Sequence, residues 1–237
     1  MNMKVIAHRG ASGLVDVENT LEAFEKAVEI KADMVEFDVR KTKDNVLVVF
    51  HDKNFQDVPI GWLTYEEMEK RANAQGFHVP LLKEVLKLLA GRIYLDIEVK
   101  EHGFEKRLVN MLHKYLKTET YSVKSFDDRV VYKVKELDPN IKTGLLLGME
   151  KATVKRRINE LFPERRLKAC HADFVSPNYQ LLHFGFIQRM HLKQYEIYVW
   201  TVNEAKLIDK LLKTSIEGII TDRPDIVFEQ MRIGDKG

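Results

Sequence analysis

Short apolar segments alternate with longer segments of helical periodicity along the chain, and this alternation limits its possible folds more than any other feature. Eight apolar segments have the length and composition of β-strands: residues 4–8, 34–39, 93–99, 121–125, 143–147, 174–176, 197–202 and 218–221. Segments of roughly 10–15 residues with helical spacing separate them, which is typical of parallel βαβ units. Eight such units in 237 residues predict one TIM (β/α)8 barrel domain over residues 1–237.

A ninth apolar segment, residues 46–50, follows the second predicted strand after only residues 41–45. A parallel crossover needs about a dozen residues or more, so this segment is expected to form an antiparallel hairpin with the second strand. With the turn centred between Asp44 and Asn45, Asp38 and His51 would lie opposite each other. The hairpin would therefore return His51 to the level of the carboxylates on the second strand.

Polar side chains stand near the ends of several predicted strands: His8, Glu36, Asp38, Glu98, Lys100 and Trp200. The C-terminal strand ends of a TIM barrel form its active site. Glu36 and Asp38 are two residues apart and share one strand face, as do Glu98 and Lys100, with Asp96 behind them as a supporting group. Three inward carboxylates would repel one another unless a cation lies between them. A hard ion such as Mg²⁺ or Ca²⁺ is favoured over zinc, which prefers nitrogen and sulfur ligands.

Composition excludes several classes of protein. The 38 basic and 36 acidic residues give a net charge of +2, which argues against a nucleic-acid-binding protein. Cys170 is the one cysteine, so no intramolecular disulfide can form and a reducing, cytoplasmic location is expected. The sequence shows neither a secretory signal nor a segment with the ~20 apolar residues that span a bilayer.

The strand ends and their neighbouring turns carry an ordered set of motifs from residue 8 to residue 224: His8-Arg9-Gly10-Ala11-Ser12-Gly13, Glu18-Asn19-Thr20, Glu36-Phe37-Asp38-Val39, Thr42-Lys43-Asp44, Val48-Val49-Phe50-His51-Asp52, Ile97-Glu98-Val99-Lys100, Trp200-Thr201-Val202-Asn203 and Gly218-Ile219-Ile220-Thr221-Asp222-Arg223-Pro224. This set resembles the motifs of the glycerophosphodiester phosphodiesterases. Each motif alone is weak evidence, whereas the complete set in this order is highly specific.

The resemblance implies a TIM barrel with a short insertion after the His51-Asp52 pair. It implies that His8 and His51 are the acid–base pair and that Arg9 and Lys100 bind phosphate. It also implies that the metal ligands are Glu36, Asp38 and Glu98. The chain departs from the family pattern at Val17, where proline is usual, and in the segment after Asp52, which is short.

The chemistry of these residues agrees with phosphodiester hydrolysis. An arginine can bind two phosphate oxygens, a lysine adds a point charge, and two imidazoles can act as general base and general acid. The expected enzyme uses Mg²⁺ or Ca²⁺, with Mn²⁺ as a further candidate, and releases an alcohol and sn-glycerol 3-phosphate from a small phosphodiester. The nucleophile, the choice of base, the head group and the oligomeric state stay open. Two alternatives are a lysophospholipase D and a catalytically silent barrel that binds phosphodiesters.

Two residues have competing interpretations. Trp200 either packs against the glycerol group of a substrate or belongs to the barrel core. Asn19 either donates a hydrogen bond near the site or caps the N-terminus of the first helix. Cys170 is expected to be a small buried apolar residue, not a nucleophile.

Overall fold

Eight parallel strands form a closed barrel in the computed structural model, which describes residues 3–148 and 154–234. The barrel strands are β1 (Lys4–Ala7), β2 (Met34–Lys41), β6 (Tyr94–Val99), β7 (Tyr121–Ser125), β8 (Lys142–Leu147), β9 (Phe174–Pro177), β10 (Glu196–Val199) and β11 (Gly218–Thr221). Each pairs with the next in space, and the pairing of β1 with both β2 and β11 closes the ring. The predicted TIM barrel is therefore confirmed.

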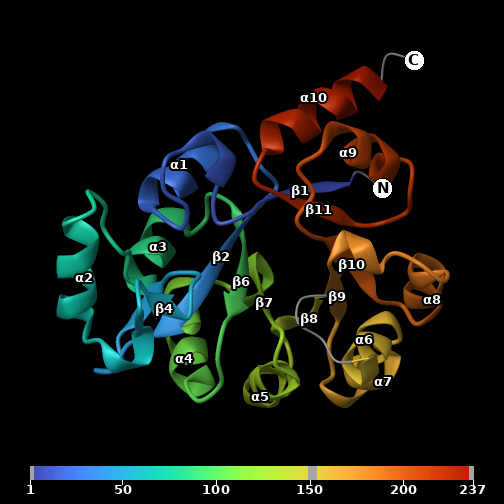
Figure 1. Ribbon diagram of the computed structural model, residues 1–237. Helices are drawn as coiled ribbons and strands as arrows, with labels where there is room; N and C mark the ends of the chain where they lie inside the picture. The colour runs from blue at the N-terminus through green and yellow to red at the C-terminus, as the bar shows by residue number, and fades with distance from the viewer. Residues whose placement is uncertain (1–2, 149–153, 235–237) are drawn as a thin grey trace.

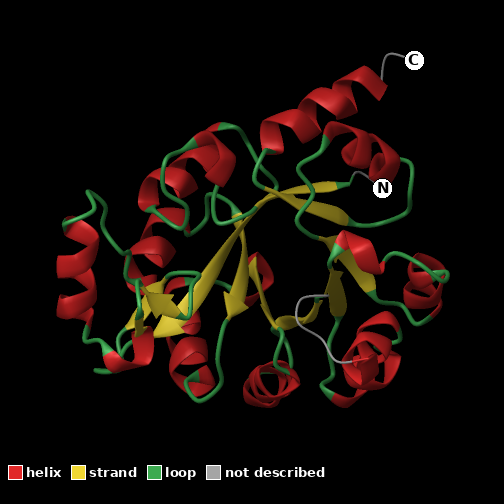
Figure 2. Ribbon diagram, in the orientation of Figure 1, coloured by secondary structure: helices red, strands yellow, loops and turns green. Residues whose placement is uncertain are grey.

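Helices surround the barrel, as Figures 1 and 2 show. They are α1 (Leu21–Glu29), α3 (Leu82–Leu89), α4 (Glu105–Tyr115), α5 (Asp128–Leu137), α6 (Val154–Leu161), α7 (Glu164–Ala169), α8 (Phe186–Leu192), α9 (Ala205–Leu212) and α10 (Pro224–Gly234). Short 3-10 helices lie at η1 (Ser12–Leu14), η3 (Thr118–Thr120) and η4 (Tyr179–Leu181). Within the described residues, no helix is both long enough and apolar enough to cross a bilayer.

Strand β2 shows how the alternation of side chains creates both core and site. Val35, Phe37 and Val39 belong to the apolar layer that the strands share with helices such as α3. Met34, on the opposite face, joins an apolar cluster with Ile6, Tyr198 and other strand residues. Glu36, Asp38 and Arg40 lie on the same strand face as Met34, because each is an even number of residues away from it. The same strand face thus changes from apolar to charged toward its carboxyl end.

The hairpin between β2 and β3 (Leu47–Val49) is antiparallel as predicted, but its predicted register is wrong by one residue. Val39 pairs with Val49, and the Phe50 amide donates to the Asp38 carbonyl at 3.0 Å, so Phe50 and not His51 lies opposite Asp38. The Thr42 amide donates to the Val46 carbonyl, which leaves a three-residue turn with Asn45 in the left-handed conformation (φ 63°). An odd number of turn residues moves the turn centre onto Asp44.

The insertion after the His51-Asp52 pair contains a two-stranded sheet of β4 (Asn54–Phe55) and β5 (Val58–Pro59), the 3-10 helix η2 (Ile60–Trp62) and helix α2 (Tyr65–Asn73). Phe55 is at its centre, with its ring centroid 5.3 Å from that of Phe50 and 6.1 Å from that of Phe77. Helix α2 stands outside the ring of barrel helices, at the left edge of Figure 1. The insertion therefore has a small apolar core of its own beside the barrel mouth.

Two predicted boundaries differ from those observed. Helix α1 begins at Leu21, and Thr20 is its N-cap because the Thr20 hydroxyl accepts from the Ala23 amide. Asn19 is therefore not the cap: it has a positive φ of 57° and its side chain turns toward the barrel. Strand β10 ends at Val199, before Trp200, which makes only an isolated bridge to Asn178.

Candidate active site

The carboxyl ends of the barrel strands enclose a cavity of about 240 Å³. It is lined by His8, Arg9, Glu36, His51, Glu98, Lys100, Lys124, Phe126, Leu146, Gly148, Trp200, Thr201 and Ile220. Seven of the eight residues that sequence analysis selected for the site are among them. The eighth, Asp38, is buried and has a carboxylate oxygen within 4.8 Å of carboxylate oxygens of Glu36 and Glu98. The structure therefore brings all eight residues together.

The turn after β1 places His8 and Arg9 at the cavity. The His8 amide continues the pairing with β11 by donating to the Thr221 carbonyl at 2.9 Å. Arg9 and Gly10 then take positive φ angles of 53° and 82°. A Cβ atom on Gly10 would lie 2.6 Å from Ala23 of α1, so only glycine allows this close approach. The arginine–glycine pair thus turns the chain sharply, and the Arg9 amide donates to Glu36 Oε2 at 3.0 Å.

His8 is held from behind by Asp222. The Nδ1 atom of His8 lies 2.6 Å from Asp222 Oδ1, which also accepts from the Ser12 hydroxyl at 2.9 Å. The other oxygen of Asp222 accepts from Asn203 Nδ2. Although burial acts to raise the pKa of Asp222, these hydrogen bonds and the charge of His8 lower it to about 2. A proton on Nδ1 is the arrangement that this carboxylate favours, so Nε2 is the atom left for chemistry.

Sequence analysis did not select Asp222 as a site residue. Its position directly after β11 was the available signal, since it is a carboxylate at another strand end. The eighth strand lies beside the first only when the barrel closes, and the contact between residues 8 and 222 depends on that closure.

Glu36, Asp38 and Glu98 form a buried carboxylate cluster. Burial, together with repulsion from Asp38 and Glu36, raises the pKa of Glu98 to about 7 in spite of the neighbouring Lys100. Burial would also raise the pKa of Asp38, but Lys100 and Arg9 outweigh it and hold that pKa well below its ordinary value. Three converging oxygen donors without a thiol among them fit a hard divalent cation such as Mg²⁺, Ca²⁺ or Mn²⁺.

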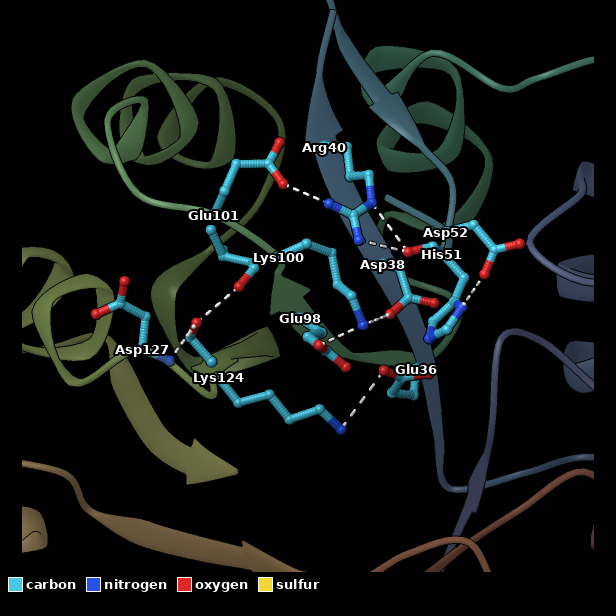
Figure 3. Close-up of polar contacts among 12 residues, drawn as sticks. Glu36, Asp38, Arg40, His51, Asp52, Glu98, Lys100, Glu101, Lys124 and Asp127 are labelled. Carbon is cyan, nitrogen blue, oxygen red and sulfur yellow. Dashed lines mark hydrogen bonds and ion pairs between the residues drawn. The ribbon is translucent and has the colours of Figure 1, made fainter. Parts of the chain in front are cut away.

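Two cations lie beside this cluster. Lys100 Nζ is 3.1 Å from Asp38 Oδ1 and 2.6 Å from Glu98 Oε1, as the dashed contacts in Figure 3 show. Arg9 pairs with Glu18 at 2.8 Å through Nη1, and its Nε lies 3.4 Å from Asp38 Oδ2. Both side chains line the cavity, so they can offer positive charge to an anion next to the carboxylates.

His51 reaches the cavity from the end of the hairpin in spite of the shifted register. Its Nδ1 lies 2.8 Å from Asp52 Oδ1. Burial and the charges of Lys100 and Arg9 lower the pKa of His51, against the opposing effect of Asp38. Arg40 fixes the backbone here, because its Nε and Nη2 donate to the His51 carbonyl at 2.9 and 2.7 Å and its Nη1 pairs with Glu101 at 2.6 Å (Figure 3). Sequence analysis missed Arg40, although it continues the face of Glu36 and Asp38.

Trp200 forms part of the cavity wall. Its indole N–H donates to the Ser176 carbonyl at 2.7 Å, and its ring meets Phe126 edge to face at a centroid distance of 5.6 Å. Asn19 contacts the site itself: its Nδ2 donates to Asp38 Oδ2 at 2.8 Å, and its Oδ1 accepts from the Asp38 amide. Asn19 therefore orients a carboxylate of the cluster, the first of the two interpretations proposed from the sequence.

Lys124 was also missed. It is fully buried on β7 and lines the cavity floor, paired with Asp96 at 2.6 Å. The available signal was a lysine inside a predicted strand, one residue before the end of that strand at Ser125. As predicted, Cys170 is buried, and burial raises the pKa of its thiol to about 11.

Comparison with known proteins gives a consistent result. The model of the glycerophosphoryl diester phosphodiesterase family matches residues 8–226. Protein YhdW of Bacillus subtilis is 33% identical to this chain, and the match covers 96% of this chain and 97% of YhdW. A glycerophosphodiester phosphodiesterase of Caldanaerobacter subterraneus is 29% identical, covering 99% of this chain and 100% of that protein. The crystal structure of a glycerophosphodiester phosphodiesterase from Parabacteroides distasonis is 28% identical, with a TM-score of 0.80 over 99% of this chain and 98% of that one.

Proposed function

Because the chain belongs to the glycerophosphoryl diester phosphodiesterase family of hydrolases, we propose that it hydrolyses glycerophosphodiesters to an alcohol and sn-glycerol 3-phosphate with a divalent metal and two histidines. The observation that carries this proposal is the carboxylate cluster of Glu36, Asp38 and Glu98, which shares one cavity with His8 and His51.

The cluster would hold the metal, whose chemical contribution when bound is to polarise the phosphoryl oxygens. Arg9 and Lys100 would bind the anionic oxygens of the substrate, since both lie at the cavity beside Asp38. Arginine provides a planar pair of donors and lysine a point charge, so the two residues have different tasks. Trp200, with Phe126 against its ring, would give the glycerol group an apolar wall.

The two histidines would divide the proton transfers. The lowered pKa of His51 keeps its ring neutral near pH 7, which suits a general base that removes a proton from the nucleophile. Asp222 holds His8 by Nδ1, so Nε2 would donate a proton to the leaving alkoxide. In this step the nucleophile's oxygen bonds to phosphorus, the bond from phosphorus to the alcohol oxygen breaks, and that oxygen takes the proton. The nucleophile is water or a hydroxyl of the glycerol group, and the second choice would give a cyclic phosphate first.

A substrate panel tests the proposal. Glycerophosphocholine, glycerophosphoethanolamine and lysophosphatidylcholine would be incubated with the protein and Mg²⁺. sn-Glycerol 3-phosphate would be measured by a coupled dehydrogenase, lysophosphatidic acid by mass spectrometry and binding by calorimetry. The variant His8→Ala is the matched control for contaminating activity. We expect turnover of the two glycerophosphodiesters by the wild type alone. Release of lysophosphatidic acid from the lysolipid alone would favour a lysophospholipase D, and binding without turnover would favour a silent barrel.

We also propose that the protein acts in the cytoplasm. The support is the single cysteine: the chain can form no intramolecular disulfide, as is usual for proteins of a reducing compartment. Fractionation of cells that carry the tagged protein tests this, and recovery outside the cytoplasmic fraction would contradict it.

A further inference from the structure

We propose that Lys124 is a third substrate-binding cation, which donates to an oxygen of the phosphodiester from the floor of the cavity. This inference rests on the proposed function, because it assigns one more residue to the same substrate.

The position of Lys124 carries the first part of the argument. Lys124 lies opposite Glu98 in the register of β6 and β7, at the level of the carboxylate cluster. It is 1% exposed, its Nζ is 2.6 Å from Asp96 Oδ2, and it also lines the cavity. Figure 3 shows the Lys124 side chain extended, with its amino group directed toward Glu36. Because the Lys124 side chain enters the cavity from the barrel interior, it can contact a ligand once that ligand has displaced the water from the cavity.

The donors of Lys124 are not all in use. An ammonium group has three N–H donors, and one of them is bonded to Asp96. The next anion, Glu36 Oε1, is 3.6 Å away, which is an ion-pair distance but too long for a hydrogen bond. Donors therefore remain for an oxygen that enters the cavity. Burial would lower the pKa of Lys124, but Asp96 and Glu36 outweigh it and raise the pKa, so the group stays charged.

The charges of the site give an independent argument. Four buried carboxylates, Asp96 and the three of the cluster, face the three cations Arg9, Lys100 and Lys124, whereas Glu18, the further partner of Arg9, is 43% exposed and screened by solvent. A divalent metal would leave this set with one positive charge, which matches the single negative charge of a phosphodiester. Without Lys124 the loaded set would be neutral and would attract the substrate less.

Lys124 also approaches from a side that the other two cations do not occupy. Arg9 and Lys100 both contact Asp38, at 3.4 and 3.1 Å. Lys124 lies on the side of Asp96 and Glu36 instead. A substrate oxygen bound by Lys124 would differ from the oxygens bound by Arg9 and Lys100. Lys124 would therefore help to fix the orientation of the phosphodiester in the cavity.

The alternative is that Lys124 only neutralises Asp96, and a mutant cycle separates the two roles. The variants are Lys124→Gln, Asp96→Asn and the double variant. In the double variant the two neutral side chains can still form a hydrogen bond with each other. The amide oxygen introduced by Asp96→Asn can also still accept from the Ser122 hydroxyl. The probe is sn-glycerol 3-phosphate, with its Kd measured by calorimetry in Mg²⁺, and melting temperature and bound metal are recorded for each variant.

A substrate-binding role predicts that Lys124→Gln and the double variant both bind the probe about tenfold or more weakly, as expected for a lost charge-assisted hydrogen bond. Asp96→Asn should bind it within about threefold of the wild type. Tight binding by the double variant would overturn the proposal, and so would an equal loss in Asp96→Asn. Should Lys124→Gln fail to fold, the double variant carries the test. Failure of the wild type to turn over any glycerophosphodiester would instead refute the proposed function.

Discussion

Replacing Asp222 by asparagine should disable His8 without changing the size of any side chain. Asp222 accepts from His8 and Ser12 through Oδ1 and from Asn203 through Oδ2. An asparagine amide in either orientation would turn N–H donors toward one of these donors. Asn203 cannot rotate to compensate, because its Oδ1 already accepts from the Thr221 hydroxyl and the residue 222 amide at 3.0 and 2.9 Å. In one orientation His8 would face an N–H donor, and in the other it would keep only an uncharged acceptor beside a donor–donor clash with Asn203, so in both cases the carboxylate that orients His8 and favours a proton on Nδ1 is lost.

The exposure of the two histidine–carboxylate pairs gives the magnitude. The Asp222 side chain is 31% exposed and the His8 side chain 14%, so a hydrogen bond to this charged partner should contribute about 1.5–3 kcal/mol. Asp52, the partner of His51, is 71% exposed, which is the range where ion pairs contribute about 0–1 kcal/mol. Asp222→Asn should thus lower kcat roughly 10- to 150-fold, and the matched Asp52→Asn at most about fivefold.

The assay is kcat and KM for glycerophosphocholine, with metal content and melting temperature measured on the same samples. KM and bound metal should change little in Asp222→Asn, because Asp222 contacts neither the carboxylate cluster nor Arg9 or Lys100 in the structure. A kcat within threefold of the wild type would refute the assigned role of Asp222. A larger loss in Asp52→Asn than in Asp222→Asn would refute the argument from burial.

Three further predictions concern the metal, the histidines and the phosphate-binding cations. Chelation should abolish activity, and Mg²⁺, Mn²⁺ or Ca²⁺ should restore it. Glu98→Gln should weaken metal binding in calorimetry, because it removes one charged ligand of the carboxylate cluster. Full activity in metal-free protein would contradict the proposed metal dependence. His8→Ala and His51→Ala should each lower kcat by about 10²–10⁴-fold with the fold retained in circular dichroism. Because the pKa of His51 is lowered from its ordinary value of 6.5 and the base acts in its neutral form, the acid-side midpoint of kcat/KM at saturating Mg²⁺ should lie below pH 6.5, and a midpoint above that pH would exclude His51 as the base. Arg9→Lys should impair turnover although the charge is kept, because lysine lacks the planar pair of donors. Lys100→Ala should remove about 2–4 kcal/mol of transition-state stabilisation. Neither variant should release the metal, and loss of metal from either would show that the role assigned to that residue is wrong.

The barrel and most of the site could be predicted because their signals are local. Each strand is indicated by its own apolar segment, and the parallel strands of a barrel have their carboxyl ends at the same end of the barrel. Glu36 and Asp38 share a face by the period of two, so their meeting follows from the strand alone. The family motifs then named the same positions.

The features that could not be predicted depend on turn geometry or on closure of the barrel. The register of the β2–β3 hairpin depends on Asn45, whose left-handed conformation makes the turn odd in length. Asn19 was a candidate helix cap because asparagine is a favoured N-cap residue and stands at the start of the predicted helix, and only the fold shows that the Thr20 side chain takes this role. The contact of Asp222 with His8 joins the two ends of the chain, and the pairing of Lys124 with Asp96 joins inward positions of neighbouring strands.

The most direct test of the central claim is phosphorus NMR of glycerophosphocholine hydrolysis in water enriched in ¹⁸O, with the carboxylate cluster loaded with Mg²⁺. The proposed chemistry predicts a single final product, sn-glycerol 3-phosphate, that carries the isotope on phosphorus whether water attacks directly or opens a cyclic phosphate. The signal should be absent from the His8→Ala protein and from chelated wild type. Phosphocholine as the product, or an unchanged substrate signal in the metal-loaded wild type, would contradict the account.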